Sequence, residues 1–165
     1  MEEIKLSVPE RLMRSRVQHY DHEKYWRYRR IVTDPNRGSR LGDLWRLYYI
    51  KRADAFNNAS MGTHRNFGAR FADTPNLPHG LNGIIVSHNA VIGRNCTIFH
   101  QMTIGEGKNG APTIGDHVLI GAGAKIIGNV HIGNNVKIGA GCVVAKDIPD
   151  HATVVCQPPR IIVKK

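Results

Sequence analysis

A repeat with a period of six residues constrains the fold of this chain more than any other feature of its sequence. Isoleucine or valine recurs at every sixth position, glycine often follows it, and a small or apolar side chain stands two places before it. The aliphatic positions are Val86, Ile92, Ile98, Ile104, Ile114, Ile120, Ile126, Ile132, Ile138 and Val144. Between Ile104 and Ile114 a spacing of ten replaces six, which indicates a four-residue insert near residues 106–110.

A six-residue period matches neither the helical repeat of about 3.6 residues nor the two-residue alternation of a half-buried strand. Such hexads are typical of a parallel β-helix, in which each hexad supplies one short strand and one corner. The aliphatic side chain points inward, and glycine fits the tight corner where a Cβ would be costly. Three hexads close one triangular coil, so we expect residues eighteen apart, such as Ile120 and Ile138, to stack in the core.

The first third of the chain lacks this repeat, and we expect a helical segment over residues 1–60 and a β-helix with an extended C-terminal tail over residues 61–165. Capping and spacing signals predict helices over 8–31 and 41–57. The second helix is expected to cover the open first coil, because the strand edges at the end of a solenoid need a cap. The first helix mixes basic and aromatic residues, so it could dock on the protein or contact a membrane or an anionic polymer.

The formal net charge of +10 is shared between both parts of the chain. A basic surface attracts phosphate-rich or acidic ligands, and a phosphorylated cofactor or an acidic glycan explains it equally well. We predict no nucleic-acid partner, because no recognised nucleic-acid module is present. The absence of a long apolar run and of a signal-peptide pattern predicts a cytoplasmic protein.

The three cysteines are Cys96, Cys142 and Cys156. Two of them occupy inward repeat positions, where cysteine behaves as a small hydrophobic residue. Their spacing differs from that of zinc sites, so we expect a structural role for the cysteines rather than a metal-binding or redox role.

Several motifs add a resemblance to a known family. They are Pro78-His79-Gly80-Leu81-Asn82-Gly83, Gln101-Met102-Thr103-Ile104-Gly105, Ile120-Gly121-Ala122-Gly123-Ala124, Lys137-Ile138-Gly139-Ala140-Gly141 and Pro158-Pro159-Arg160-Ile161. Over about residues 62–163 the chain resembles the hexapeptide-repeat acyltransferases, most closely the serine acetyltransferase branch. The resemblance implies a left-handed β-helix, a homotrimer or pair of trimers, and transfer of an acetyl group from acetyl-CoA to a hydroxyl in a groove between subunits.

The chemistry of this transfer needs a base, because a hydroxyl is a poor nucleophile at neutral pH and must lose its proton as it attacks the thioester. Histidine has a suitable pKa. The resemblance assigns this role to His79, with direct attack and no covalent enzyme intermediate. It also gives a backbone N–H at Gly105 or Gly107 for the oxyanion. Asp73, Glu106 or a backbone carbonyl could orient the imidazole.

The resemblance also implies how acetyl-CoA binds. It places the pantetheine arm along backbone at Gly105, Ala122 and Ala140, and the phosphates near Lys137 and Arg160. The repeat itself needs small corner residues, and the two cations could simply be solvated, so both readings stay open for these positions.

Three positions depart from the serine enzymes. His64 and Pro78 stand where those enzymes carry aspartates, and Ala111 replaces a second active-site histidine. The Pro-His-Gly corner and short basic start resemble O-acetyltransferases of capsule, exopolysaccharide and lipopolysaccharide assembly. We therefore predict a hydroxyl on a sugar or polysaccharide precursor as acceptor, with serine O-acetylation in cysteine biosynthesis as the alternative.

Two other functions are open to this fold. The γ-class carbonic anhydrases bind zinc with a histidine pair five residues apart, a spacing that this sequence lacks. A non-catalytic scaffold or binding protein is the second alternative, and the Pro-His-Gly corner, the insert and the Pro-Arg tail argue against it.

His88, His117 and His131 occupy outward repeat positions, whereas His100 could reach the groove.

Overall fold

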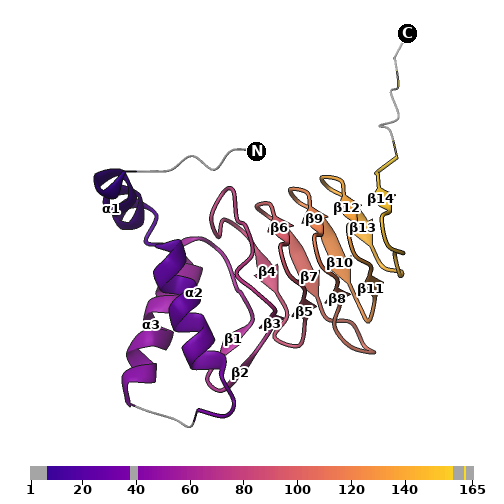
Figure 1. Cartoon of the computed structure of the whole chain (residues 1–165). Coiled ribbons are helices and arrows are strands. Elements are labelled where there is room, and N and C mark those ends of the chain that lie inside the picture. The colour runs from indigo at the N-terminus through magenta and orange to yellow at the C-terminus, as the bar shows by residue number, and fades with distance from the viewer. Residues whose placement is uncertain (1–6, 38–40, 158–161, 163–165) are drawn as a thin grey trace.

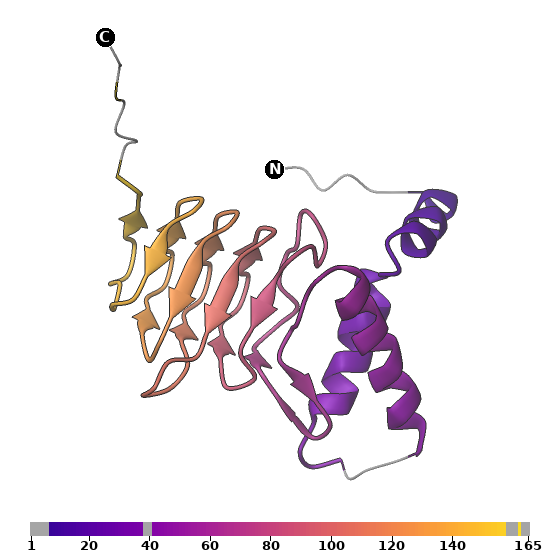
Figure 2. The ribbon, with the colours of Figure 1, turned by 180° about the vertical axis from the view of Figure 1, so that it is seen from behind.

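The chain folds into a left-handed parallel β-helix preceded by an N-terminal helical segment, and it is mostly β, as the sequence predicted (Figures 1 and 2). The computed structural model describes residues 7–37, 41–157 and 162. The helices are α1 (Val8–Val17), α2 (His22–Thr33) and α3 (Leu41–Phe56). None of these described helices has the length and apolar character that a bilayer crossing needs.

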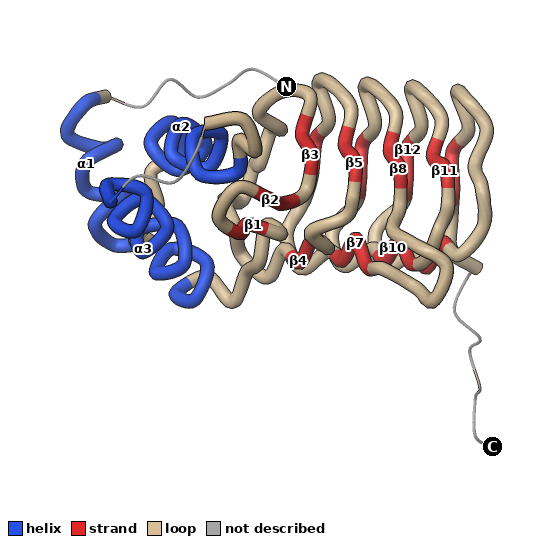
Figure 3. Tube along the Cα trace, turned by 90° about the horizontal axis from the view of Figure 1, so that it is seen from below, coloured by secondary structure: helices blue, strands red, loops and turns tan. Residues whose placement is uncertain are grey.

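Most of the strands are only two residues long, and they stack in rows along the column (Figure 3). They are β1 (Thr63–His64), β2 (Phe67–Gly68), β3 (Arg70–Phe71), β4 (Ile85–Val86), β5 (Val91–Ile92), β6 (Thr97–Ile98), β7 (Thr103–Gly105), β8 (Thr113–Ile114), β9 (Leu119–Ile120), β10 (Lys125–Ile127), β11 (His131–Ile132), β12 (Lys137–Ile138), β13 (Val143–Val144) and β14 (Thr153–Val154). Three parallel four-stranded sheets, β13-β10-β7-β4, β11-β8-β5-β3 and β14-β12-β9-β6, form the faces of the prism.

The register of the coils follows the repeat. Ile120 lies opposite Ile138, eighteen residues on, as predicted. Ile104 lies opposite Ile126, because the four-residue insert between β7 and β8 lengthens that coil. The inward aliphatic side chains are almost fully buried, whereas the strand residues beside them face outward. The period therefore determined both the core and the position of the insert between β7 and β8.

The predicted helix over 8–31 is divided into α1 and α2. The break coincides with His19, which adopts a positive φ of 50°, and with Asp21, which is the N-cap of α2. The carboxylate of Asp21 accepts a hydrogen bond from the amide of Lys24 at 2.9 Å, which satisfies an otherwise unpaired donor in the first turn. The positive φ at His19 interrupts the predicted helix, and the N-cap Asp21 begins a new one.

Contrary to the expectation that the second predicted helix covers the first coil, α2 packs on β1 and β2, and α3 packs on α2. Trp26 of α2 meets the ring of Phe71 at 4.8 Å between centroids. The guanidinium of Arg29, also from α2, donates to the carbonyls of Met61 at 3.0 Å and Ala69 at 2.6 Å. A buried cation thus satisfies irregular backbone that the coils leave unpaired at their N-terminal end.

The inward stack can be tested with two adjacent residues. Ile120 is fully buried, and Leu119 on the opposite face of the same strand is 37% exposed. We expect Ile120→Ala to lower the free energy of unfolding by about 2–5 kcal/mol, because it leaves a cavity in the stack. Leu119→Ala should cost less than about 1 kcal/mol. Equal losses in urea denaturation would contradict the assigned core.

The carboxyl of Asp54 gives a pH test of the helical segment. Burial raises its pKa to about 6, although the Tyr25 hydroxyl donates to it at 2.6 Å. The folded chain then binds this proton more tightly than the unfolded chain, so the contribution is complete below about pH 4 and is lost as the pH rises through about 6.

We expect Asp54→Asn to remove most of this slope, a difference of about 3 kcal/mol between the two ends of the window. Asparagine is a fair mimic of the protonated carboxyl, because its carbonyl can still accept from Tyr25. Denaturation curves of both chains between pH 4 and pH 7 measure the effect. If the free energies of unfolding of the two chains change with pH in parallel, the carboxyl of Asp54 is ionised in the folded chain across this whole pH range.

Candidate functional site

The candidate site is centred on a bulged corner between β3 and β4 that carries the exposed side chain of His79. Gly83 ends this corner with a φ of 64°, and its amide donates to the carbonyl of Asn57 at 2.9 Å. A Cβ at Gly83 would lie 3.2 Å from the Cα of Gln101, so the position also requires the close approach that glycine allows. Backbone contacts with two neighbouring segments therefore fix the corner.

The corners that lead from the β6-β9-β12-β14 sheet into the β4-β7-β10-β13 sheet stack into one edge of the prism, which we call the His79 edge. It consists of residues 77–84, 99–102, 121–124, 139–142 and 155–156. Backbone hydrogen bonds join its steps. The amide of Gly123 donates to the carbonyl of His100 at 3.0 Å, and that of Gly141 donates to Ala122 at 2.8 Å. Residues far apart in sequence thus follow one another along a straight edge.

Two aromatic residues of the next step stand beside His79. Its ring lies 4.8 Å from that of His100 and 5.8 Å from that of Phe99, measured between centroids. The Nδ1 atom of His100 is buried and has no hydrogen-bond partner within the part of the chain that the structure describes. The sequence indicated that His100 could reach the groove, and the structure brings it next to the predicted base.

The predicted cofactor-binding residues are divided between two parts of the prism. Ala122 and Ala140 lie on the His79 edge, and Lys137 is exposed on β12, the strand that leads into the step of Ala140. Gly105 ends β7 on the far side of the adjacent face. Arg160 falls outside the described residues. In one chain, His79, Ala122 and Ala140 therefore lie along the same edge, whereas Gly105 lies elsewhere.

Gly105 begins a second edge, which we call the loop edge because it contains the insert. It consists of residues 87–90, 105–112 and 127–130. The Glu106 carboxylate accepts hydrogen bonds here from Ser87 Oγ at 3.1 Å and Asn89 Nδ2 at 2.9 Å. Asp73 accepts from the amide of Asn95 at 2.9 Å. Glu106 and Asp73 are the two carboxylates that could orient His79. Both accept these hydrogen bonds from groups other than His79.

The three departures from the serine enzymes occupy different surroundings. Pro78 adjoins His79 in the corner, and Ala111 is half-buried on the loop edge. His64, on β1, stacks edge-on against His88 with 5.6 Å between ring centroids. A histidine pair therefore occupies the position where the resemblance leads one to expect an aspartate partner for the base.

The helical segment supports the His79 corner, a role that the sequence did not reveal. The ring of Tyr20 lies 3.7 Å from the point where a Cβ on Gly80 would stand. Its hydroxyl is 2.7 Å from His22 Nδ1, and burial raises the pKa of this phenol. Tyr20 lies in the connection between α1 and α2, so the break between those helices is what delivers its side chain to the corner.

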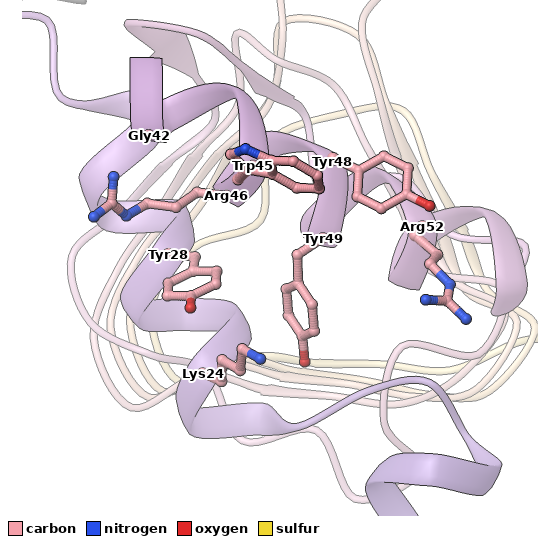
Figure 4. A pocket seen from close by; sticks show the side chains of 8 residues that line it. All are labelled: Lys24, Tyr28, Gly42, Trp45, Arg46, Tyr48, Tyr49 and Arg52. Atoms are coloured by element: carbon pink, nitrogen blue, oxygen red, sulfur yellow. The ribbon is translucent and has the colours of Figure 1, made fainter. Parts of the chain in front are cut away.

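A separate cleft of about 380 Å³ opens between α2 and α3 (Figure 4). The ammonium group of Lys24 lies 4.5 Å from the centroid of the Tyr49 ring, and the exposed rings of Trp45 and Tyr48 meet edge to face at 6.2 Å. The lining residues are Lys24, Tyr28, Gly42, Trp45, Arg46, Tyr48, Tyr49 and Arg52. The cleft shares no residue with either edge of the prism.

Comparison with known proteins gives this geometry a family context. Residues 111–146 match the family described as bacterial transferase hexapeptide (six repeats). The serine acetyltransferase of Bacillus pumilus is 37% identical over 129 residues, which are 72% of this chain and 57% of that protein. That of Synechococcus elongatus is 42% identical over 99 residues, 58% of this chain and 40% of that protein.

Among solved structures, the serine acetyltransferase of Neisseria gonorrhoeae in complex with serine matches with a TM-score of 0.59 and 36% identity, over 72% of this chain and 48% of that chain. The matched coils thus carry the hexapeptide repeat of bacterial transferases. The chain is similar to serine acetyltransferases, and it spans about half the length of these relatives.

Proposed function

We propose that this chain is an acetyl-CoA-dependent O-acetyltransferase that acetylates the hydroxyl of serine, with His79 as general base. The observation that carries this assignment is the position of His79. It is an exposed imidazole at the start of an edge whose later steps carry the small residues Ala122 and Ala140. Small side chains along an edge let an extended ligand approach the backbone closely. The similarity to serine acetyltransferases supports the same reaction.

In this mechanism the imidazole of His79 takes the proton from the acceptor hydroxyl as its oxygen attacks the carbonyl carbon of the acetyl thioester. A tetrahedral intermediate forms, and a backbone N–H at Gly105 or Gly107 stabilises its oxyanion. The intermediate then collapses, the carbon–sulfur bond breaks, and the imidazolium returns the proton to the departing thiolate of CoA. The acetyl group is thereby moved from sulfur to oxygen without a covalent enzyme intermediate.

The positions of the two edges favour a homotrimer. His79 and Gly105 lie on different edges of one prism, separated by the face that β4, β7, β10 and β13 form. The mechanism needs the base and the oxyanion donor at one carbonyl group. Packing of copies side by side, with the His79 edge of one against the loop edge of the next, would bring both to a shared groove.

A sugar hydroxyl is the second candidate acceptor. The sequence motifs favour a sugar acceptor, but the similar proteins of known function are serine acetyltransferases, which favours serine. The three departures from the serine enzymes keep a sugar hydroxyl as a candidate acceptor. His64 stacks on His88, and Pro78 and Ala111 supply no polar side chain. These are positions at which the serine enzymes hold the amino acid, according to the resemblance.

An assay of CoA release decides between the acceptors. The purified chain is mixed with acetyl-CoA and a thiol-reactive dye, and L-serine or members of a panel of sugars and oligosaccharides are added separately. We expect serine to give the highest kcat/KM, because the similarity to known enzymes is to those that acetylate it. A higher value for a sugar would replace serine with the second candidate. No turnover with any acceptor, together with no binding of acetyl-CoA, would remove the enzymatic function.

The role of His79 is tested by substitution with alanine. We expect His79→Ala to lower kcat by about 10²–10⁴-fold, because a general base contributes about that much. Its melting temperature should stay close to that of the wild type, because the side chain is exposed. His131→Ala is the matched control, since His131 is an exposed histidine on β11. Full activity of His79→Ala would place the base elsewhere.

A further inference from the structure

Two cysteine side chains meet at the C-terminal end of the His79 edge. Cys142 points into the column and is 2% exposed, whereas Cys156 is exposed beyond β14. Their sulfur atoms lie 2.8 Å apart, and the Cys156 thiol also faces the carbonyl of Ala140 at 3.5 Å. The third cysteine, Cys96, lies in an earlier coil and contacts the carbonyl of Gly115 at 3.3 Å. The chain therefore has one close thiol pair and one separate thiol.

The coils bring this pair together. β14 runs parallel to β12, with Val154 opposite Ile138, so Cys156 lies beside Ala140 two residues further on. Cys142 follows in the same corner and turns its side chain inward. β14 is the terminal strand of its sheet and has β12 as its one neighbour there. Strand β14 is thus hydrogen-bonded to a neighbouring strand on one side, and the thiol pair lies where the chain leaves the column after β14.

We propose that Cys142 and Cys156 form an intramolecular disulfide when the chain meets a low-molecular-weight disulfide such as oxidised glutathione. The thiolate of Cys156 attacks one sulfur of the reagent, which releases one glutathione thiolate and leaves a mixed disulfide on Cys156. The thiolate of Cys142 then attacks the Cys156 sulfur and releases the second glutathione. The two protein thiols lose two electrons and two protons, and the reagent is reduced to two thiols.

Exposure determines the order of these steps. Cys156 is the sulfur that a reagent in solution can reach, and buried Cys142 can attack it without further access from solvent. Forming the bond requires the sulfurs to approach to about 2 Å, a movement of less than about 1 Å from their present separation. Burial and the neighbouring sulfur of Cys156 raise the pKa of the Cys142 thiol. The second step should therefore accelerate as the pH rises above neutrality.

The bond would fasten the end of the column. It closes a loop of the chain that includes β13 and β14, and it links the exit of the last strand to an inward residue of the coil below. This gives Cys142 and Cys156 a chemistry beyond the packing role that the sequence predicted for the cysteines. The proposal does not rest on the acetyl-transfer function, because neither sulfur takes part in that reaction, but the thiol pair lies on the same edge, beside Ala140.

Thiol counting tests this modification on the full chain. The native protein is incubated with oxidised glutathione, then unfolded, alkylated with iodoacetamide and weighed by mass spectrometry. We expect one alkylated thiol per chain, on Cys96, and three after prior reduction. Three alkylated thiols after oxidation, a disulfide that includes Cys96, or a covalent dimer would each overturn the assignment.

The Cys156→Ser variant is the matched control, because its substituted residue is exposed and its fold should be unaffected. It should keep two alkylated thiols after the same treatment. The Cys142→Ser variant should stop at the mixed disulfide of Cys156 with glutathione, seen as a glutathione adduct that reductant removes. Oxidation should also raise the melting temperature of the wild type, because the link restricts the unfolded chain, and should leave that of Cys156→Ser unchanged. An equal rise in both would attribute the effect to another site.

Discussion

The stacking of isoleucine and valine side chains inside closed coils is the interaction on which the rest of this structure depends. Strands of two residues have little stability of their own, because each contributes only a few ladder hydrogen bonds. Ile92, Ile114 and Ile132 lie one above another in parallel register and are almost completely buried. Each such side chain contributes about 2 kcal/mol of hydrophobic stabilisation, so the column is held from within.

This inward stack leaves the corners free to differ. The corner of His79 is bulged, the corner after β7 contains the insert, and the corners at 121–124 and 139–142 consist of small residues. Because the strands between them are fixed in register, an irregular corner changes what the edge presents without disturbing the core. The division of the predicted site between the His79 edge and the loop edge follows from this arrangement, and it underlies the proposal of a groove shared between copies.

The helical segment shows where sequence patterns were insufficient. Arg29 was one of many basic residues in a predicted helix, but it is buried and bonded to the carbonyls of Met61 and Ala69. Nothing in its spacing distinguishes it from the exposed cations around it. Likewise, helical periodicity predicted a helix over 41–57, which α3 confirms over Leu41–Phe56, but it could not decide that α2 would lie between that helix and the first strands. The aromatic contact of Trp26 with Phe71 decides this packing.

The sequence by itself determined the coils, their register and the displaced coil at the insert, because these follow from one short period along the chain. The family resemblance, and not the period, singled out His79. The tertiary structure alone decided which side chains meet along an edge. It placed His100 against His79, Tyr20 against the corner, and Cys142 against Cys156. These contacts join residues from different coils or from segments without a repeat, so their proximity arises only once the chain has wound upon itself.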